Sequence, residues 1–368
     1  MMAYIAVYST CFAFTAMETF AYKKSQVWAI ICGIFLILFA GLRGDIDCDY
    51  AAYKEMFFYA NSLFSYHKML DSFSAMRVEP GYGLFIVICK TISKQSVFLF
   101  LGTALLAVSF NIRAFIRYTP LPMLAVLIYA SHAYWYKDFI TIRAGLASGI
   151  LLFTIQPLME RRLLRFLLIV GFATTIQMSA AIFLLAWLAT RSNFNSRSIS
   201  VALFISALLG QTGVPVALIK LGLKLNILPQ IISIYFEWDI FNYSISLINP
   251  TVIKTLLVCF LIIWKRSWVI KSRLRIVICN MYIIGACWLM IMSGFAILAA
   301  RGAALFFVVE PIIITGIVYT YRKYYFMPII LFVYFCIFVL NLYKLPLEPY
   351  KLFTSNHTYS LPIFEEKP

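Results

Sequence analysis

Long apolar runs recur along the whole of the 368-residue chain, and they constrain its fold more than any other feature. An apolar run of about 20 residues crosses a membrane as a helix, because a helix satisfies its own backbone hydrogen bonds. The chain is 63% hydrophobic and 12% charged, with a mean hydropathy of +0.89, which excludes an ordinary soluble domain. The sequence therefore predicts an all-α, polytopic integral membrane protein with about 10–13 transmembrane helices. The expected spans are residues 3–21, 26–42, 95–112, 120–136, 141–158, 198–213, 251–264, 276–292, 303–320 and 326–342.

The run at residues 163–190 is too long for one span and too short for two full ones. A polar break at 174–177 divides it, so we expect a hairpin of two short helices. One strongly tilted span is the alternative. The neighbouring apolar piece at 81–93 is interrupted by Lys90 and followed by Lys94, and we expect it to be re-entrant or to lie in the membrane interface.

The net charge of +16 comes mostly from lysine and arginine in short loops between apolar runs, which argues against a nucleic-acid-binding surface. These basic loops share one face only if the hairpin returns to the side that it left. By the positive-inside rule that face is cytoplasmic. Both termini and the polar loops at 43–80 and 214–250 are then expected outside. Residues 1–342 are interpreted as one transmembrane domain and 343–368 as an outer tail.

Residues 41–50 (GLRGDIDCDY) place an arginine and three carboxylates directly after an apolar run. Ionisable groups at that depth are costly, and clusters of them usually contact a substrate. Asp45, Asp47 and Asp49 alternate after Arg43, so an extended segment would bring their carboxylates to one face. An EF-hand is excluded because its glycine and glutamate are missing. A short Asp-x-Asp metal site and a solvated acidic turn remain as alternatives, and of the eight cysteines only the one in this segment is expected to meet water.

Other ionisable residues lie at the expected outer ends of spans. Glu79 precedes a Pro-Gly turn that returns it to the membrane surface, and Lys137 lies between two spans. Arg143 opens a helix against the macrodipole, so we expect a negative partner, either a carboxylate or a ligand phosphate; a snorkelling arginine is the alternative. Arg301 is placed in an outer loop. Glu310, inside the next span, is expected to pair with an arginine or to line a hydrated cavity.

Five elements in order resemble the EpsG-like and Wzy-type polysaccharide polymerases. Arg43 to Tyr50 and Tyr53 are similar to the family's R-G-x-G-T-D-x-x-x-Y element, and Glu79 begins its E-x-G-[FY] element. Residues 142–147 (IRAGLA) resemble its I-R-[QA]-G-L-A helix start. The break at residues 177–180 resembles A-x-x-x-H-x-S-A, with Gln177 in place of the histidine, and Arg301 falls where a late arginine is expected. Asp47-Cys48 replaces Gly-Thr in the first element.

The resemblance implies a glycosyltransferase of the bacterial inner membrane, an O-antigen polymerase that joins undecaprenyl-pyrophosphate-linked repeat units on the periplasmic face. It implies Asp49 or Glu79 as the catalytic carboxylate. Substrate-binding roles go to the following residues: Arg43, Tyr50, Lys137, Arg143, Gln177 and Arg301. No metal or other cofactor is required. Membrane lipid and a chain-length regulator protein are the expected partners besides the lipid-linked glycan. The alternatives are an O-antigen ligase and a polysaccharide flippase or transporter, although no inverted repeat is evident.

Overall fold

The structure is a computed structural model that describes residues 2–21, 26–61, 78–190, 194–226, 233, 236, 243–321, 326–345 and 347–353. Across these ranges the secondary structure is helical, with one isolated backbone bridge between Arg43 and Leu352. The prediction of an all-α membrane protein is confirmed. Residues 62–77, most of 227–242 and residues 354–368, which belong to the two predicted outer loops and the tail, lie outside the described residues.

Helices in the first half of the chain follow the apolar runs, and several begin at a proline, which suits the first helical turn. They are α1 (Met2–Ala21), α2 (Gln26–Gly41), α3 (Tyr50–Tyr59), α5 (Pro80–Ile92), α6 (Val97–Tyr118), α7 (Pro122–Ser131), the π-helix η1 (Tyr134–Ile140), α8 (Ile142–Leu151), the 3-10 helix η2 (Leu152–Thr154) and α9 (Ile155–Glu160).

The second half begins with two helices on either side of Gln177, and asparagine side chains cap α11 and α14. The helices are α10 (Leu163–Ile176), the 3-10 helix η3 (Met178–Thr190), α11 (Ser196–Gln211), α12 (Val214–Lys224), α14 (Pro250–Trp264), α15 (Arg266–Val269), α16 (Arg273–Ile291), α17 (Ala296–Phe306), the 3-10 helix η5 (Phe307–Val309), α18 (Glu310–Tyr321) and α19 (Phe326–Lys344).

Fewer helices pass a length and hydropathy test for membrane spans than the sequence predicts. Within the described residues five do so, or six if the bent pair α11–α12 is counted as one broken span. Several predicted spans form apolar helices of 10–17 residues instead. The run at 120–136, for example, begins as a helix only at Pro122 and changes to a π-helix after α7. The first part of the predicted outer loop at 214–250 is itself helical, since it forms α12. This helix follows α11 after a bend of 64°.

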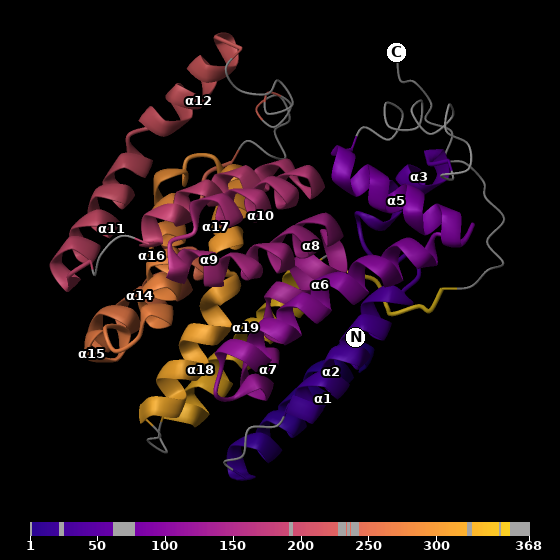
Figure 1. Ribbon diagram of the computed structural model, residues 1–368, viewed down its shortest axis with the longest axis horizontal. Coiled ribbons are helices and arrows are strands. Elements are labelled where there is room, and N and C mark those ends of the chain that lie inside the picture. The colour runs from indigo at the N-terminus through magenta and orange to yellow at the C-terminus, as the bar shows by residue number, and fades with distance from the viewer. Residues whose placement is uncertain are drawn as a thin grey trace.

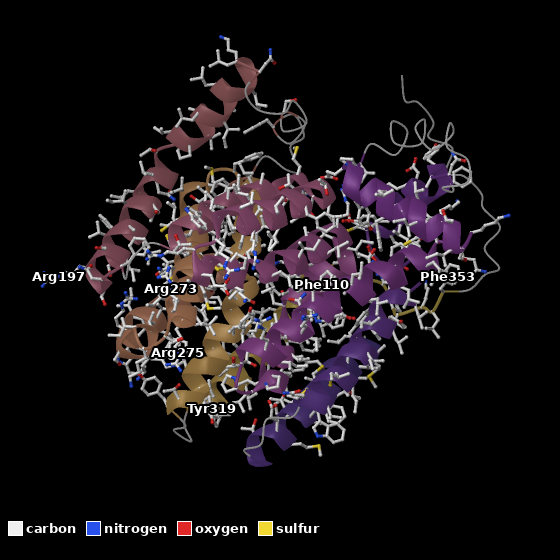
Figure 2. The ribbon with its side chains drawn as sticks, viewed as in Figure 1. Phe110, Arg197, Arg273, Arg275, Tyr319 and Phe353 are labelled. Carbon is white, nitrogen blue, oxygen red and sulfur yellow. The ribbon has the colours of Figure 1, made fainter. Side chains whose placement is uncertain are left out.

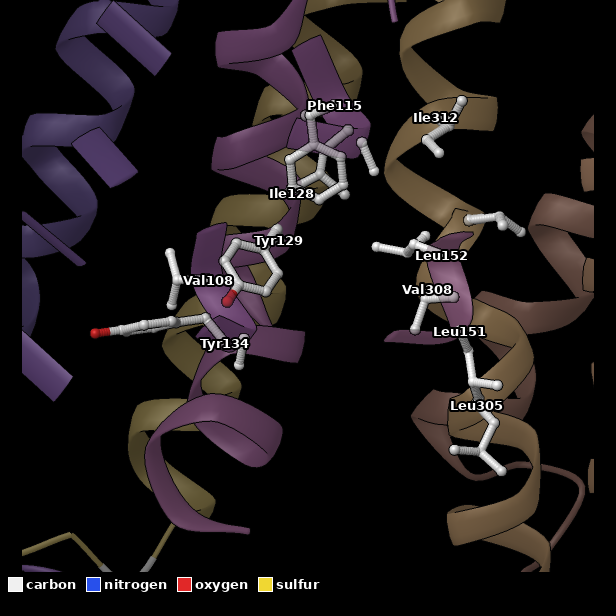
Figure 3. Close-up of a cluster of buried hydrophobic side chains, with 14 of the residues drawn as sticks. Val108, Phe115, Ile128, Tyr129, Tyr134, Leu151, Leu152, Leu305, Val308 and Ile312 are labelled. Atoms are coloured by element: carbon white, nitrogen blue, oxygen red, sulfur yellow. The ribbon is translucent and has the colours of Figure 1, made fainter. Parts of the chain in front are cut away.

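Two helices organise the packing, as Figure 1 shows. α6 packs against α2, α5, α7 and α8, and α16 packs against α11, α14, α17 and η3. Apolar side chains from α6, α7, α8 and α17 fill the space between them, and Figure 3 shows Phe115, Ile128 and Leu151 in this cluster. The result is a helical bundle in which α3 and α5 lie at one end and α15 lies at the other (Figure 1).

The predicted hairpin at 163–190 is confirmed. α10 ends where Gln177 adopts an extended backbone conformation, and η3 then packs back along α10. The guanidinium of Arg273 donates to the carbonyl oxygen of Met159, before the hairpin, at 3.4 Å and to that of Thr190, at its end, at 2.6 Å. Both ends of the hairpin therefore lie at the same end of the bundle, and its break lies at the opposite end.

Basic residues mark the end of the bundle to which the hairpin returns. Figure 2 labels Arg197, Arg273 and Arg275 toward the lower left of the molecule, together with Tyr319 near the end of α18. Phe353, from the segment that follows α19, lies at the opposite side. That all the basic loops share one face of the membrane stays a prediction, and the loops at 22–25 and 322–325 lie outside the described residues.

Close contact between α2 and α6 depends on the absence of a side chain at Gly41. A Cβ atom at this position would lie 2.7 Å from the Cα of Leu101 on α6, and the α6 backbone cannot move aside as a side chain can. Small residues allow membrane helices to approach closely and gain dispersion contacts. Gly171 offers a contrast, because a Cβ there would meet nothing within 4 Å.

We expect Gly41→Ala to lower stability by about 1–3 kcal/mol through overpacking. Gly171→Ala is the matched control, since it adds the same methyl group in open space and improves helix propensity by about 1 kcal/mol. Thermal unfolding of the purified protein in detergent measures both changes. An unchanged or higher Tm for Gly41→Ala would contradict the close packing of α2 on α6.

Candidate functional site

Arg43, the first ionisable residue after α2, is fully buried. Its Nε donates to Asp47 Oδ2 at 2.9 Å and its Nη1 donates to the carbonyl oxygen of Ala40 at 2.7 Å. The guanidinium lies between the rings of Phe100 and Phe139, 4.8 and 4.7 Å from their centroids. Burial strengthens both the ion pair and the cation–π contacts because water does not compete for the charge. The buried Arg43 side chain therefore holds the loop that follows α2 in place through these contacts.

The segment after α19 packs on this same loop. The N–H of Gly44 donates to the carbonyl oxygen of Lys351 at 2.8 Å, and that of Phe353 donates to Leu42 at 2.9 Å. The hydroxyl of Tyr350 donates to the carbonyl oxygen of Phe39 at 3.0 Å. The part of the predicted tail that the structure describes thus returns to the end of α2 and covers Arg43.

The three aspartates of the loop occupy different environments. The expected extended segment is a turn, so the side chains do not share one face: Asp45 is exposed and Asp47 is buried against Arg43. Asp49 is partly exposed, and its N–H donates to Asp47 Oδ1 at 3.1 Å. Among the described residues, no group of three His, Cys, Asp or Glu side chains has the geometry of a metal site.

Asp49 is the carboxylate on which the charges of several arginines converge. Burial raises its pKa above the ordinary value of 3.8, and the positive charges of Arg301, Arg143 and Arg43 act in the opposite direction, with Arg301 the strongest of the three. These arginines come from α17, from the start of α8 and from the loop after α2. The fold therefore brings three arginines that are distant in sequence into electrostatic range of one carboxylate.

Glu79, at the start of α5, contacts the start of α8 and the break of the hairpin. Its Oε2 accepts from Arg143 Nη1 at 2.6 Å, and its Oε1 accepts from the backbone N–H of Met178 at 3.0 Å. The two side chains are 23% and 28% exposed, so the pair is half-buried at an accessible surface. The negative partner expected for Arg143 is thus a carboxylate of the protein. One side chain holds the starts of α5 and α8 against the break of the hairpin.

The hairpin break itself is polar. Gln177 Nε2 donates to Ser179 Oγ at 3.0 Å, and Gln177 Oε1 is buried with no hydrogen-bond partner among the described residues. Gly81, two residues after Glu79, allows α5 to approach this break, because a Cβ there would lie 2.8 Å from the carbonyl oxygen of Thr175. Gln177 therefore lies beside Glu79 and Arg143.

Lys137 links the π-helix η1 to the helix that carries Arg301. Its Nζ donates to the carbonyl oxygen of Ala304 at 2.6 Å, one turn along α17 from Arg301. π-Helical turns are rare and frequently occur at functional sites. Arg301 itself is exposed and lies within α17, so its predicted position in a loop is wrong. α17 begins five residues earlier, at Ala296, and extends the span toward the site.

Tyr50 is buried and stacks on Phe100, with ring centroids 4.4 Å apart and planes 3° apart. No site role was predicted for the neighbouring Tyr53, yet its ring centroid lies 5.9 Å from the guanidinium carbon of Arg143. Tyr53 occurs one helical turn after Tyr50, which is the signal that places both rings on one face of α3. The pair forms an aromatic wall between Arg43 and Arg143.

Glu310 belongs to a second polar cluster, away from Glu79. Its partner is Lys254 of α14, with Nζ to oxygen distances of 3.0 and 2.9 Å, so the expected arginine partner is wrong. The hydroxyls of Tyr282 and Tyr334 also donate to Glu310. A buried carboxylate needs this many donors, because an unpaired charge is costly inside a membrane protein. Here the cluster joins α14, α16, α18 and α19.

Taken together, the fold and the site define a helical membrane protein that holds arginines and carboxylates at one end of its bundle. The chain belongs to the EpsG family, because the sequence model of that family matches residues 26–352. The resemblance inferred from the motifs is thereby confirmed. The matched range contains every candidate site residue named above.

One curated relative is the "Amylovoran biosynthesis protein AmsC" of Erwinia amylovora, to which the chain is similar with 28% identity over 149 residues. The match covers 39% of this chain and 39% of the relative, so the chain aligns with about two fifths of that protein's length. No solved structure matches the chain.

Cys48 gives a chemical probe of the site, because it is the only exposed cysteine among the described residues. Burial raises the pKa of its thiol, and so do the negative charges of Asp49 and Asp47. We expect a membrane-impermeant maleimide to label Cys48 in intact cells, slowly at neutral pH and faster as pH rises, since the thiolate reacts. Asp49→Asn should speed the labelling, because it removes a charge that disfavours the thiolate.

Mass spectrometry of the tryptic peptide measures the labelling, and Cys48→Ser is the control for reaction at other cysteines. Labelling that requires permeabilised inner membranes would place this loop on the cytoplasmic side. An unchanged rate in Asp49→Asn would contradict the electrostatic contact between the two side chains.

Proposed function

We propose that the protein is a polysaccharide polymerase of the bacterial inner membrane, and specifically an O-antigen polymerase. It joins oligosaccharide repeat units linked to undecaprenyl pyrophosphate by glycosyl transfer on the periplasmic face. Membership of the EpsG family and the similarity to a protein of amylovoran biosynthesis support a role in polysaccharide assembly. The single observation that carries the chemistry is the convergence of three arginines on Asp49.

Asp49 is the better candidate for the catalytic carboxylate. Both oxygens of Glu79 already accept hydrogen bonds, from Arg143 and from the N–H of Met178, so Glu79 is better suited to hold the site together. Asp49 is partly exposed and makes no salt bridge within 4.0 Å in the described structure. Its raised pKa also brings it closer to the value that a general base needs.

The arginines differ in what they can contact. Arg301 is exposed and the Arg143 side chain is 28% exposed, so both are accessible to a pyrophosphate. Lys137 donates to the carbonyl oxygen of Ala304, on the same helix as Arg301, and adds positive charge. The side chain of Arg43 is 0% exposed, so we assign it a positioning role behind Asp47 and Asp49. Planar guanidinium groups suit bidentate binding of phosphate oxygens.

The proposed reaction needs one base and one group of cations. The acceptor hydroxyl oxygen forms a bond to the anomeric carbon of the donor sugar, and its proton passes to Asp49. The bond between that carbon and the pyrophosphate oxygen breaks, and undecaprenyl pyrophosphate leaves with the electron pair. Arg301 and Arg143 stabilise the negative charge that develops on the leaving group, which is the main contribution of a preorganised polar site.

Aromatic and amide groups near the two charged pairs fit recognition of a sugar. Tyr53 lies beside Arg143, and the buried Oε1 of Gln177 accepts no hydrogen bond from the described residues. A glycan hydroxyl supplies a donor for such an oxygen. Glutamine does not exchange protons near neutral pH, so Gln177 binds rather than acts as a base. A chain-length regulator in the same membrane is the proposed protein partner.

We expect Arg143→Ala and Arg301→Ala each to reduce long-chain polymer by about 100-fold or more, the usual effect of removing one donor that stabilises developing charge. The assay is the glycan ladder of a deletion strain that carries each variant. Arg197→Ala is the matched control, because Arg197 is exposed and lies at the opposite, basic end of the bundle.

Protein level is measured in parallel, so that loss of the ladder is not loss of the protein. A ladder close to wild type in both variants would overturn the pyrophosphate role. A deletion strain that keeps core plus one repeat unit supports a polymerase, whereas loss of all O-antigen from the core indicates a ligase.

The raised pKa of Asp49 predicts a pH effect whose sign is fixed. The base acts when ionised, so polymerisation falls as pH drops through the pKa of Asp49. Because burial raises this pKa above 3.8, the loss begins at a higher pH than for an ordinary aspartate. Polymerisation in membrane preparations across pH measures the profile. Asp49→Asn should be inactive at every pH, and an active Asp49→Asn enzyme would exclude the proposed base.

A further inference from the structure

A small cavity of about 50 Å³ opens at the basic end of the bundle, between the last turns of α6 and the segment formed by η2 and α9. Apolar side chains form one part of its lining and polar side chains the other. The lining residues are Phe110, Arg113, Ala114, Arg117, Tyr118, Leu152, Phe153 and Gln156. All of them are described, and none belongs to the site around Asp49.

The two arginines of the cavity lie one turn apart on α6 and are exposed. Among the described residues, no carboxylate forms a salt bridge with either of them. Arg117 is held in place, because its Nη2 donates to Gln156 Oε1 at 2.6 Å. Gln156 in turn donates to Glu160, whose charge is paired with Arg162 at 2.8 Å.

The apolar part of the cavity is exposed where the chain would meet lipid. Phe153 is 39% exposed, and the guanidinium carbon of Arg113 lies 5.9 Å from its ring centroid. α6 and the helix from Ile142 to Glu160 are both long and apolar enough to span a membrane, and both end beside this cavity. The cavity therefore lies at the depth where headgroups meet acyl chains.

We propose that this cavity binds the phosphate headgroup of an anionic phospholipid. Arg113 and Arg117 contact the phosphodiester, and Phe110 and Phe153 contact the first methylene groups of an acyl chain. Two guanidinium groups suit a phosphate, and basic pockets between helix ends are suited to lipid headgroups. The ordered chain Glu160–Gln156–Arg117 orients one of the two cations in advance.

The test uses the purified full-length protein in detergent with phosphatidylglycerol or phosphatidylcholine of identical acyl chains, and native mass spectrometry counts the bound lipid. We expect phosphatidylglycerol to bind about tenfold or more tightly than phosphatidylcholine, because each basic group near an anionic lipid makes the free energy of binding more favourable. The double variant Arg113→Ala/Arg117→Ala should lose this preference. Arg197→Ala removes the same charge outside the cavity, and we expect it to leave the preference unchanged.

Two further variants keep the test independent of folding defects. Arg113→Gln removes one charge that contacts the ring of Phe153 and forms no side-chain hydrogen bond with another described residue. Gln156→Ala keeps both charges but removes the hydrogen bond that holds Arg117. We expect it to reduce the preference for phosphatidylglycerol by about threefold, less than the double arginine variant does.

Unchanged phosphatidylglycerol binding in both arginine variants would overturn the proposal. An equal loss in Arg197→Ala would also overturn it, because the attraction would then belong to the whole basic face. Displacement of the lipid by millimolar inorganic phosphate would assign the cavity to a small anion instead. Elution of every variant as a single symmetrical peak confirms that the comparison is between folded proteins.

Discussion

The two oxygens of the Glu79 carboxylate hold together three parts of the chain that are otherwise far apart. One oxygen accepts from Arg143 at the start of α8, and the other accepts from the N–H of Met178 at the hairpin break. A hydrogen bond to a charged group is stronger than a neutral one, and half-burial reduces competition from water. Because the starts of α5 and α8 and the end of α10 meet here, the position of the candidate site depends on this side chain.

Charge pairing explains how the site can be both stable and reactive. Arg43 is paired with Asp47 and Arg143 with Glu79, and each pairing offsets part of the cost of burying the two charges. The positive charge of Arg301 acts on Asp49, and Asp49 itself forms no salt bridge with a described residue. The proposed catalytic groups are therefore those that the fold leaves accessible, and the buried pairs around them set their geometry.

Local patterns in the sequence predicted the helical membrane fold, the hairpin and the family. The break at Gln177 was predictable because polar residues interrupt an apolar run, and the elements around Glu79 and Arg143 were identified by spacing. Burial was not predictable in the same way. Arg43 looked like a surface cation because the rings of Phe100 and Phe139 that enclose it are distant in sequence. Lys254 as the partner of Glu310 also depends on tertiary packing.

The return of residues 347–353 to the loop after α2 has a consequence for the order in which the protein is made. Arg43 emerges early in synthesis, whereas Lys351 and Leu352, which pair with the backbone beside it, emerge much later. The hydroxyl of Tyr4, on the first helix, donates to the carbonyl oxygen of Glu348 at 2.6 Å. The two ends of the described chain thus close over the same arginine. Its enclosure is completed only after residues 347–353 have been synthesised, so a chain terminated before them lacks an enclosed Arg43.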